Sequence, residues 1–407
     1  MTTTTIRRIT LVIILSLPGF VVFGQISLDD LAGQEGSRVI TTAVPFISFA
    51  PDSRASGMGD VGVATSPDAN SVHWNNGKLA FIDHNFGASL SYSPWLGKIV
   101  DDMSLSYLSG YYKIDRIQTV GLSMRYFDLG EIQLTDDGGN PLGIENPREM
   151  AFDGTYSRKL TEKIGIGVTA RYIWSNLIGS VTGAAKPGKS FAVDLGFYYT
   201  NPIVISGKDS EISFGAAITN IGQKVTYSSE SEADFIPINL RVGTALKVGL
   251  DAYNSLTFAL DLNKLMVPTP PIYAEDPDTG EPAVDNNGDQ IIFKGKDPNR
   301  NLIGGMFGSF SDAPNGFSEE MQEIMIATGV EYWYKELFAA RLGYFYENKD
   351  KGGRQYLTLG LGFRYQKFGV DFSYLVPGDN NHPLAETIRF SLLFNFDKAE
   401  VQDTTLN

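Results

Sequence analysis

Residues 356–364 read Tyr-Leu-Thr-Leu-Gly-Leu-Gly-Phe-Arg, and this stretch decides the fold class. Every second residue is large and apolar, and the residues between them are small or polar. Successive side chains of a β-strand point to opposite faces, so this period of two predicts a strand with one apolar and one polar face. The apolar set is Leu357, Leu359, Leu361 and Phe363, and the opposite set is Thr358, Gly360, Gly362 and Arg364.

The same alternation recurs along most of the chain. It is seen in fourteen segments, which are 85–96, 103–113, 117–128, 148–160, 162–176, 189–200, 210–220, 234–249, 255–266, 324–334, 337–347, 355–366, 368–376 and 385–396. Single-chain outer-membrane barrels have an even number of antiparallel strands. We therefore predict an all-β membrane protein, with a 14-stranded antiparallel outer-membrane β-barrel over residues 85–396.

The connections between these segments are alternately tight and long. Outer-membrane barrels have short periplasmic turns and longer extracellular loops, so this asymmetry supports the barrel. On the short side, residues 201–209 are the one connection expected to be longer than a tight turn. On the long side, the connection 267–323 is far longer than ordinary loops, and such loops are usually functional or disordered.

A secreted β-sandwich would also show strands with a period of two. Sandwich strands, however, are usually about 5–6 residues long, and the segments here are longer. Many of them also end in an aromatic residue, like the girdles of membrane barrels at the two water interfaces. Examples are Tyr92, Tyr126, Trp174, Tyr199, Tyr346 and Phe396.

The composition excludes several kinds of site. The chain has 407 residues and a formal net charge of −14, whereas a nucleic-acid partner needs a basic surface. It has no Cys, which excludes disulfides and thiolate metal sites, and only three His (His73, His84 and His382). The Asp-rich stretch 276–289 lacks the spacing of an EF-hand loop and is expected to form ordinary turns. We expect no metal, no cofactor and no nucleic acid.

The N-terminus has the features of a secretory signal peptide. Arg7 and Arg8 precede an apolar run over 9–23, which is shorter than the about 20 residues that a spanning helix needs. The small residue Gly24 follows, so residues 1–24 are expected to be removed. The mature protein is then expected in the cell outer membrane, with residues 397–407 as a periplasmic tail.

Ten charged residues fall on the small-residue face of the predicted strands. A charge facing lipid costs several kcal/mol near the bilayer midplane, so these side chains are expected to face the lumen. Because both signs are present, we expect ion pairs across the barrel rather than an ion-selective pore. The residues are Arg125, Arg171, Asp194, Arg241, Asp261, Glu331, Arg341, Arg364, Asp371 and Arg389.

The segment before the barrel, residues 25–84, contains a motif rich in small residues. It reads Arg-Ala-Ser-Gly-Met-Gly-Asp-Val-Gly-Val-Ala over 54–64, then Pro-Asp-Ala-Asn-Ser over 67–71 and Trp-Asn at 74–75. This resembles the N-terminal region of outer-membrane transporters related to the fatty-acid channel FadL, although Asn-Gly at 76–77 departs from their pattern. The resemblance implies a hatch inside the barrel rather than a surface leader. The implied hatch residues are Arg54, Gly57, Met58, Gly59, Asp60, Ala64, Asp68, Ala69, Trp74 and Asn75.

A narrower resemblance is to the PorV (LptO) family of outer-membrane components of the type IX secretion system of Bacteroidetes. It is carried by Phe-Ala-Pro-Asp-Ser-Arg at 49–54, by Lys-Leu-Ala-Phe at 78–81 and by residues 306–320. The resemblance implies protein transport and no enzymatic activity. It implies binding of the C-terminal signal domain of cargo proteins and its delivery to the attachment complex. The implied partners are a giant translocon barrel of the SprA/Sov type, a PorU-like sortase, these signal domains and outer-membrane lipid.

The long connection 267–323 is polar at first and then becomes apolar and aromatic. An exposed apolar patch on an outer loop suggests a docking surface, so we expect this part of the loop to bind a partner. The alternative is that the same side chains fold back over the barrel mouth. The residues concerned are Leu302, Ile303, Met306, Phe307, Phe310, Asp312 and Phe317.

Two other functions are compatible with the same fold. A FadL-type channel for hydrophobic small molecules would need a mostly apolar pocket, whereas the expected lumen is rich in charge. A lipid-acting enzyme with a Ser-His-acid site would need a His beside a Ser. Only His382 has a suitable position, in the connection 377–384, and no Ser lies near it in the sequence. We therefore expect no enzyme.

Overall fold

The structure is a computed structural model of the chain. It describes residues 38–96, 102–135, 138–177, 186–227, 233–275, 283–286, 288–378 and 387–397. The predicted signal peptide, His382 and all but the first residue of the predicted tail lie outside these ranges. Within the described residues, no helix has the length and apolar character to cross a membrane.

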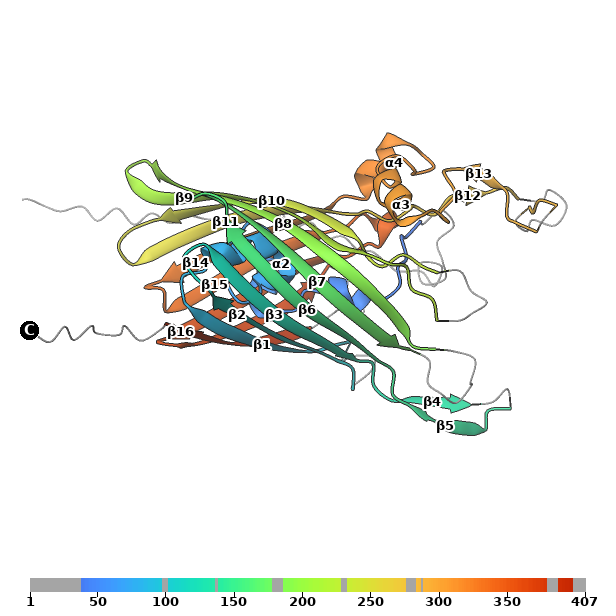
Figure 1. The fold of residues 1–407 in the computed structure, drawn as a ribbon, viewed down its shortest axis with the longest axis horizontal. Coiled ribbons are helices and arrows are strands. Elements are labelled where there is room, and N and C mark those ends of the chain that lie inside the picture. The colour runs from blue at the N-terminus through green and yellow to red at the C-terminus, as the bar shows by residue number, and fades with distance from the viewer. Residues whose placement is uncertain are drawn as a thin grey trace, which may run out of the picture. The chain divides into compact units, whose positions relative to one another are not determined.

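Fourteen antiparallel strands form one closed barrel, and this confirms the fold predicted from the alternation (Figure 1). Each strand pairs with its neighbour along the chain, and the first pairs with the last. The strands are β1 (Phe86–Pro94), β2 (Ser104–Lys113), β3 (Gln118–Asp128), β6 (Arg148–Lys159), β7 (Ile164–Asn176), β8 (Gly188–Ile205), β9 (Lys208–Gly222), β10 (Asn239–Gly249), β11 (Asn254–Leu265), β14 (Met325–Tyr334), β15 (Phe338–Tyr346), β16 (Gln355–Tyr365), β17 (Phe368–Pro377) and β18 (Ile388–Phe396).

The two faces of each strand separate as the sequence indicates. In β16, Leu357, Leu359 and Leu361 are exposed on the outer wall, while Thr358 is buried inside. Long apolar side chains on the outside and buried small or polar ones inside are the arrangement of a barrel whose outer wall faces lipid. Closure leaves no unpaired strand edge, which a bilayer could not satisfy.

Two expectations about the strands are wrong. Residues 201–209 are not a long turn, because β8 and β9 stay paired down to Ile205 and Lys208. Only Ser206 and Gly207 remain between them, with φ of 52° and 76°, as a two-residue hairpin turn requires. The second wrong expectation concerns the start of β10, which begins at Asn239 rather than at 234. Pro237 lies in the segment before the strand.

Additional elements gather at the end of the barrel that carries the long connections, called here the long-loop end (Figure 1). They are the hairpins β4 (Ile132–Thr135) with β5 (Pro141–Glu145) and β12 (Ile272–Tyr273) with β13 (Ile292–Lys294), the helices α3 (Leu302–Gly308) and α4 (Phe317–Gln322), and the 3-10 turn η5 (Lys349–Lys351). The opposite, short-turn end has only tight connections. By the usual asymmetry of such barrels, the long-loop end faces the cell exterior.

Residues 38–84, called here the hatch, lie inside the barrel (Figure 1). They contain the short helices η2 (Pro45–Ser48), α1 (Ser53–Ser56), α2 (Ser71–Trp74) and η3 (Asn76–Phe81). Apolar hatch side chains such as Met58 and Leu79 are fully buried. The hatch therefore supplies much of the core that the barrel wall surrounds.

Candidate functional site: the hatch, the mouth cavity and the long loop

A chain of buried charges ties the hatch to the barrel wall. Arg54 of α1 donates to both carboxylate oxygens of Glu331 in β14, at 3.0 and 2.9 Å, and also pairs with Asp68 of the hatch. Glu331 accepts a further hydrogen bond from Arg341 at 2.7 Å, and Arg341 in turn pairs with Asp371. A buried charge needs such partners to offset its lost hydration, so these groups hold one another in place.

Backbone packing adds a second attachment. Gly57 lies against Gly360 of β16 so closely that a Cβ on Gly57 would be 2.9 Å from the Gly360 Cα. Gly59 has φ of 72°, which favours glycine, and its N–H donates to the Thr358 hydroxyl at 2.8 Å. Met58, between them, is fully buried. The small residues of the motif therefore let the hatch backbone touch the strands directly.

The rest of the motif holds the hatch in its fold. The Trp74 Nε1 donates to Asp52 at 2.6 Å, and Asn75 donates to the carbonyls of Val63 and Phe197. An Asp68 oxygen accepts from the N–H of Asn70. The structure places three more motif residues: Ala64 and Ala69 are buried, and Asp60 accepts from the Tyr356 hydroxyl.

The departure from the FadL-related pattern, Asn76-Gly77, packs on the opposite side of the barrel. Asn76 donates to the Thr169 hydroxyl at 2.9 Å and to the Asp194 carbonyl. A Cβ on Gly77 would lie 3.1 Å from the backbone of Gly196. This dipeptide therefore forms the contact of the hatch with β7 and β8.

The ten lumen charges do not pair across the barrel as expected. Arg171 pairs with Asp153 and Asp194 on the two strands beside its own, and Arg364 pairs with Asp371 of the adjacent strand. The hatch fills the middle of the lumen, so these inward charges reach the hatch itself or strands one or two places away, as Arg341 of β15 reaches Asp371 of β17. Asp261, for example, accepts from the N–H groups of Gly62 and Val63 at 2.7 and 2.9 Å.

The three remaining lumen arginines have no carboxylate partner among the ion pairs of the described residues. Arg125 donates to the Phe46 carbonyl and to the His73 Nδ1. Arg241 lies over the Trp74 ring at 4.9 Å, and Arg389 over the Trp95 ring at 6.0 Å. Aromatic faces stabilise cations only partly, and Nη1 of Arg241 and Nε of Arg389 make no hydrogen bond.

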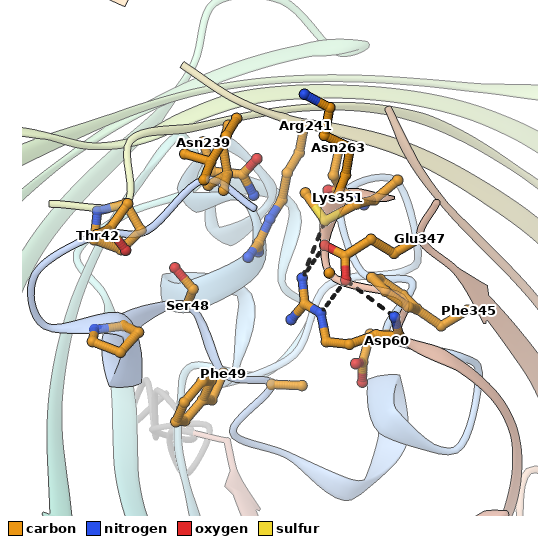
Figure 2. Close-up of a pocket in the computed structure, with 18 of the residues that line it drawn as sticks. Thr42, Ser48, Phe49, Asp60, Asn239, Arg241, Asn263, Phe345, Glu347 and Lys351 are labelled. Carbon is orange, nitrogen blue, oxygen red and sulfur yellow. Dashed lines mark hydrogen bonds and ion pairs between the residues drawn. The ribbon is translucent and has the colours of Figure 1, made fainter. Parts of the chain in front are cut away.

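A cavity of about 470 Å³ opens between the hatch and the long-loop end, and is called here the mouth cavity (Figure 2). Its lining combines hatch residues with residues at the long-loop ends of the strands. The apolar part includes Ile40, Phe49, Trp74, Trp95, Leu265, Met325 and Phe345. The polar part includes Ser48, Asp60, Asn239, Arg241, Asn263, Glu347, Lys351, Arg354 and Arg389.

A smaller cavity of about 220 Å³ lies at the short-turn end of the lumen. Arg54 and Asp68 of the hatch line it, together with Trp333 and Arg364 of the wall. Other hatch residues, Asp60 among them, line the mouth cavity. The hatch therefore borders both cavities and lies between them.

Burial shifts the pKa values of several hatch groups. It lowers the pKa of His73 well below its ordinary value, and the nearby Arg125 acts in the same direction. Burial also lowers the pKa of Lys78 to about 8, although the Lys78 Nζ donates to the Gly62 carbonyl at 2.6 Å. His73 is therefore neutral at physiological pH. No cluster suited to a metal ion is found among the described His, Asp and Glu side chains.

The apolar residues of the long loop divide into two sets. Met306 is buried, Leu302 packs against the core, and Asp312 is buried and accepts from the Thr269 N–H. The other four point outward and are called here the loop patch. Their exposed fractions are 58% for Ile303, 61% for Phe307, 45% for Phe310 and 78% for Phe317.

Ion pairs hold this loop against the barrel mouth. Glu319 of α4 pairs with Arg38 and Lys351 at 2.8 and 2.7 Å. Glu323 pairs with Lys351 and with Lys264 at the end of β11. These five residues, called here the clamp, connect the hatch, the long loop and the 347–354 loop. Partial burial raises the pKa of Glu319, but hydrogen bonds from Arg38 and Lys351 outweigh this and lower the pKa to about 2.

Comparison with known protein families identifies the family of this chain. The sequence model of a family described as type IX secretion system protein PorV matches residues 32–272, more than half of the chain. The chain belongs to the PorV family. The matched range begins before the hatch and extends to the start of the long loop, so it includes the hatch motif and strands β1 to β11. The PorV-family resemblance noted in the sequence is thereby confirmed, and with it a place in the outer membrane and in type IX secretion.

Several solved structures are similar to this PorV-family chain. The Ralstonia pickettii toluene transporter TbuX is 11% identical, with a TM-score of 0.44 over 86% of this chain and 98% of its own. The P. putida toluene transporter TodX is 11% identical, with a TM-score of 0.47 over 85% and 99%. A Pseudomonas aeruginosa FadL homologue is 11% identical, with a TM-score of 0.43 over 88% and 100%. A search among curated proteins found no match.

Two features of this PorV-family structure were missed by sequence reasoning. The clamp joins Arg38, Lys264 and Lys351 to Glu319 of α4 and to Glu323 directly after it, and only the four-residue spacing of these two glutamates hinted at it. The second feature is Met321, which is half exposed one helical turn after Phe317. The same i, i+4 spacing would have extended the loop patch to it.

Proposed function

We propose that this PorV-family protein binds the C-terminal signal domain of secreted cargo at the translocon and delivers it to a PorU-like sortase. The proposal starts from the family, which assigns the chain to type IX secretion. It adds that the loop patch is the surface through which the barrel docks onto a protein partner. The partner is a giant translocon barrel of the SprA/Sov type.

The single observation that carries the proposal is the exposure of the loop patch. Phe317 and Phe307 expose more than half of their surface at the end of the barrel that lies outside the membrane. Exposed apolar patches of soluble surfaces are characteristic of interaction sites, because burying them in a partner releases ordered water. Because the clamp holds α4 in place, Phe317 needs little ordering on binding.

The plugged lumen supports a docking role rather than free passage. The hatch lies between the two cavities and is attached to opposite walls, through Arg54 to β14 and through Asn76 to β7. Passage of a small molecule through the barrel would therefore require breaking buried ion pairs. No enzymatic role is proposed, because the family to which the chain belongs is one of protein secretion.

The experiment is a pull-down of the tagged protein from mildly solubilised outer membranes, followed by mass spectrometry. The test variant is Phe307→Ser with Phe317→Ser, and the matched control is Ile144→Ser, an exposed apolar residue of the β4–β5 hairpin. We expect the wild type and the control to recover a very large barrel, a sortase and proteins with similar C-terminal domains. The double variant should recover at least ten-fold less of the translocon barrel than the wild type does.

Two results would contradict the proposal. If the double variant recovers the same partners as the wild type, the loop patch is not the docking surface. If the wild type recovers no secretion partner but carries bound fatty acid or another hydrophobic molecule, the alternative function, a FadL-type channel for hydrophobic small molecules, is favoured. The mouth cavity would then be the site of that ligand.

A further inference from the structure

The mouth cavity contains buried polar atoms that have no partner. Arg241 is 5% exposed, and its Nη1 makes no hydrogen bond. Three further atoms also make no hydrogen bond: Oδ1 of Asp60, Oδ1 of Asn239 and the hydroxyl oxygen of Ser48. All four residues line the cavity. Buried polar groups are nearly always hydrogen-bonded, and each exception calls for an explanation such as an absent ligand.

Arg241 is held in position rather than free to find a partner. Its guanidinium group lies over the Trp74 ring, and Trp74 is fixed by its hydrogen bond to Asp52. The nearby carboxylate of Asp261 forms no ion pair with Arg241 among the described residues: its Oδ2 accepts from the hatch N–H groups of Gly62 and Val63, and its Oδ1 makes no hydrogen bond. The remaining guanidinium donors of Arg241 are therefore preorganised for an acceptor that comes from outside the chain (Figure 2).

The unpaired atoms define the chemistry of a ligand. Arg241 and Ser48 offer donors to a carboxylate, and the unpartnered Nε of Arg389 adds a second cation in the cavity wall. Asp60 and Asn239 offer acceptors, which require N–H groups. A fatty acid supplies a carboxylate but no donor. The last residues of a polypeptide supply a carboxylate, backbone N–H groups and side chains for the aromatic part of the lining.

We propose that the mouth cavity binds the free C-terminal end of a polypeptide chain, with its α-carboxylate on Arg241. This inference rests on the proposed function, and the polypeptide is then the end of a cargo signal domain. A volume of about 470 Å³ suits a ligand of a few residues. The cavity opens toward the long-loop end, where Ile40 and Lys351 line it and where cargo would arrive from the translocon.

The test compares two synthetic peptides on the purified full-length protein in detergent. Both carry the last ten residues of a cargo signal domain from the same organism, one with a free C-terminal carboxylate and one with a C-terminal amide. We expect the acid to bind at least ten-fold more tightly than the amide. This comparison needs no variant, so it cannot be confused with a folding defect. Equal binding of the two peptides, or binding of neither, would overturn the inference.

Variants then locate the carboxylate. Arg241→Gln should reduce acid binding to the level of the amide, and Arg241→Lys should retain part of the difference. The matched control is Arg148→Gln, an exposed arginine at the long-loop end that does not line the cavity. Heat-modifiable gel mobility would verify that each variant is folded. A folded Arg241→Gln variant that still prefers the acid would assign the carboxylate elsewhere and overturn the assignment.

Dodecanoate, a fatty acid, tests whether the carboxylate bound in the cavity comes from a lipid instead of a peptide. It should neither bind at micromolar concentration nor displace the acid peptide. Tight, Arg241-dependent dodecanoate binding without peptide binding would replace the inference with a lipid site. The pull-down separates this inference from the proposed function. If wild-type protein recovers the secretion partners while the peptides fail to discriminate, only the cavity inference falls.

Discussion

Arg54 and Glu331 are joined by two hydrogen bonds, of 3.0 and 2.9 Å, although 277 residues separate them along the chain. One belongs to the hatch and the other to β14, and both side chains are buried. The contact is thus a buried electrostatic link between the hatch and the wall, and its loss has consequences that can be measured.

Replacement of Arg54 by Gln is expected to destabilise the protein by on the order of 3 kcal/mol, since it leaves Glu331 with one cation fewer in a buried site. Urea unfolding in detergent, followed by gel mobility, would measure this. The exposed control Arg148→Gln should change the free energy of unfolding by less than about 0.5 kcal/mol. Similar values for the two variants would show that the hatch does not depend on this pair.

Replacement of Gly62 by Ala should destabilise the hatch by about 1–3 kcal/mol, because the added Cβ would overlap the Trp74 ring. The matched control is Gly154→Ala, where a Cβ meets nothing within 4 Å. We expect faster tryptic cleavage within the hatch for the first variant alone. Equal cleavage rates would contradict the tight packing at Gly62.

The clamp predicts a response to acid. Glu319 has an ordinary pKa of 4.5 that the clamp lowers to about 2. Its contribution to stability is therefore fully present above about pH 4.5 and is lost as the pH falls toward 2. Proteolysis of the long loop as a function of pH should accelerate only in that window. In Glu319→Gln the loop should already be cleaved faster at pH 7, whereas the exposed control Glu162→Gln should match the wild type.

Lys78 predicts a response in the alkaline range. Burial lowers its pKa from 10.5 to about 8, so between these values the unfolded chain binds a proton that the folded protein lacks. Stability should therefore rise with pH in this window, by up to about 1.4 kcal/mol per pH unit. The difference in unfolding free energy between the wild type and Lys78→Gln isolates this contribution. A difference that stays constant from pH 8 to 10.5 would contradict it.

The barrel could be predicted from sequence because each strand carries its own signal. Alternation of the kind seen in 356–364 is a local property, and pairing follows from the order of the segments. The errors arose where local rules compete. At 201–209 the predicted strands ended at 200 and began again at 210, but the pairing continues and Ser206 and Gly207 alone suffice for the turn. At 234–238 the apolar pattern continued, yet Ile236 is buried at the mouth instead of facing lipid.

The site could be predicted only in part. The resemblance of the hatch motif indicated which residues lie inside, but not which wall groups they contact. The partners of Arg241 and Arg125 depend on where the hatch lies in the closed barrel, and no local sequence pattern specifies that position. The long loop shows the same limit. Met306 and Phe307 are adjacent and similar, yet one is buried and the other exposed, because helix α3 presents only one face to the core.

The contact between Ser53 and Ser391 bears on how the molecule assembles. The Ser53 N–H donates to the Ser391 hydroxyl at 2.9 Å, across 338 residues of sequence. Ser391 lies in β18, the strand that closes the barrel against β1. This contact of the hatch can therefore form only once the last strand is in place. The seating of the hatch and the closure of the wall are expected to form one late step, with contacts of long sequence separation that slow folding.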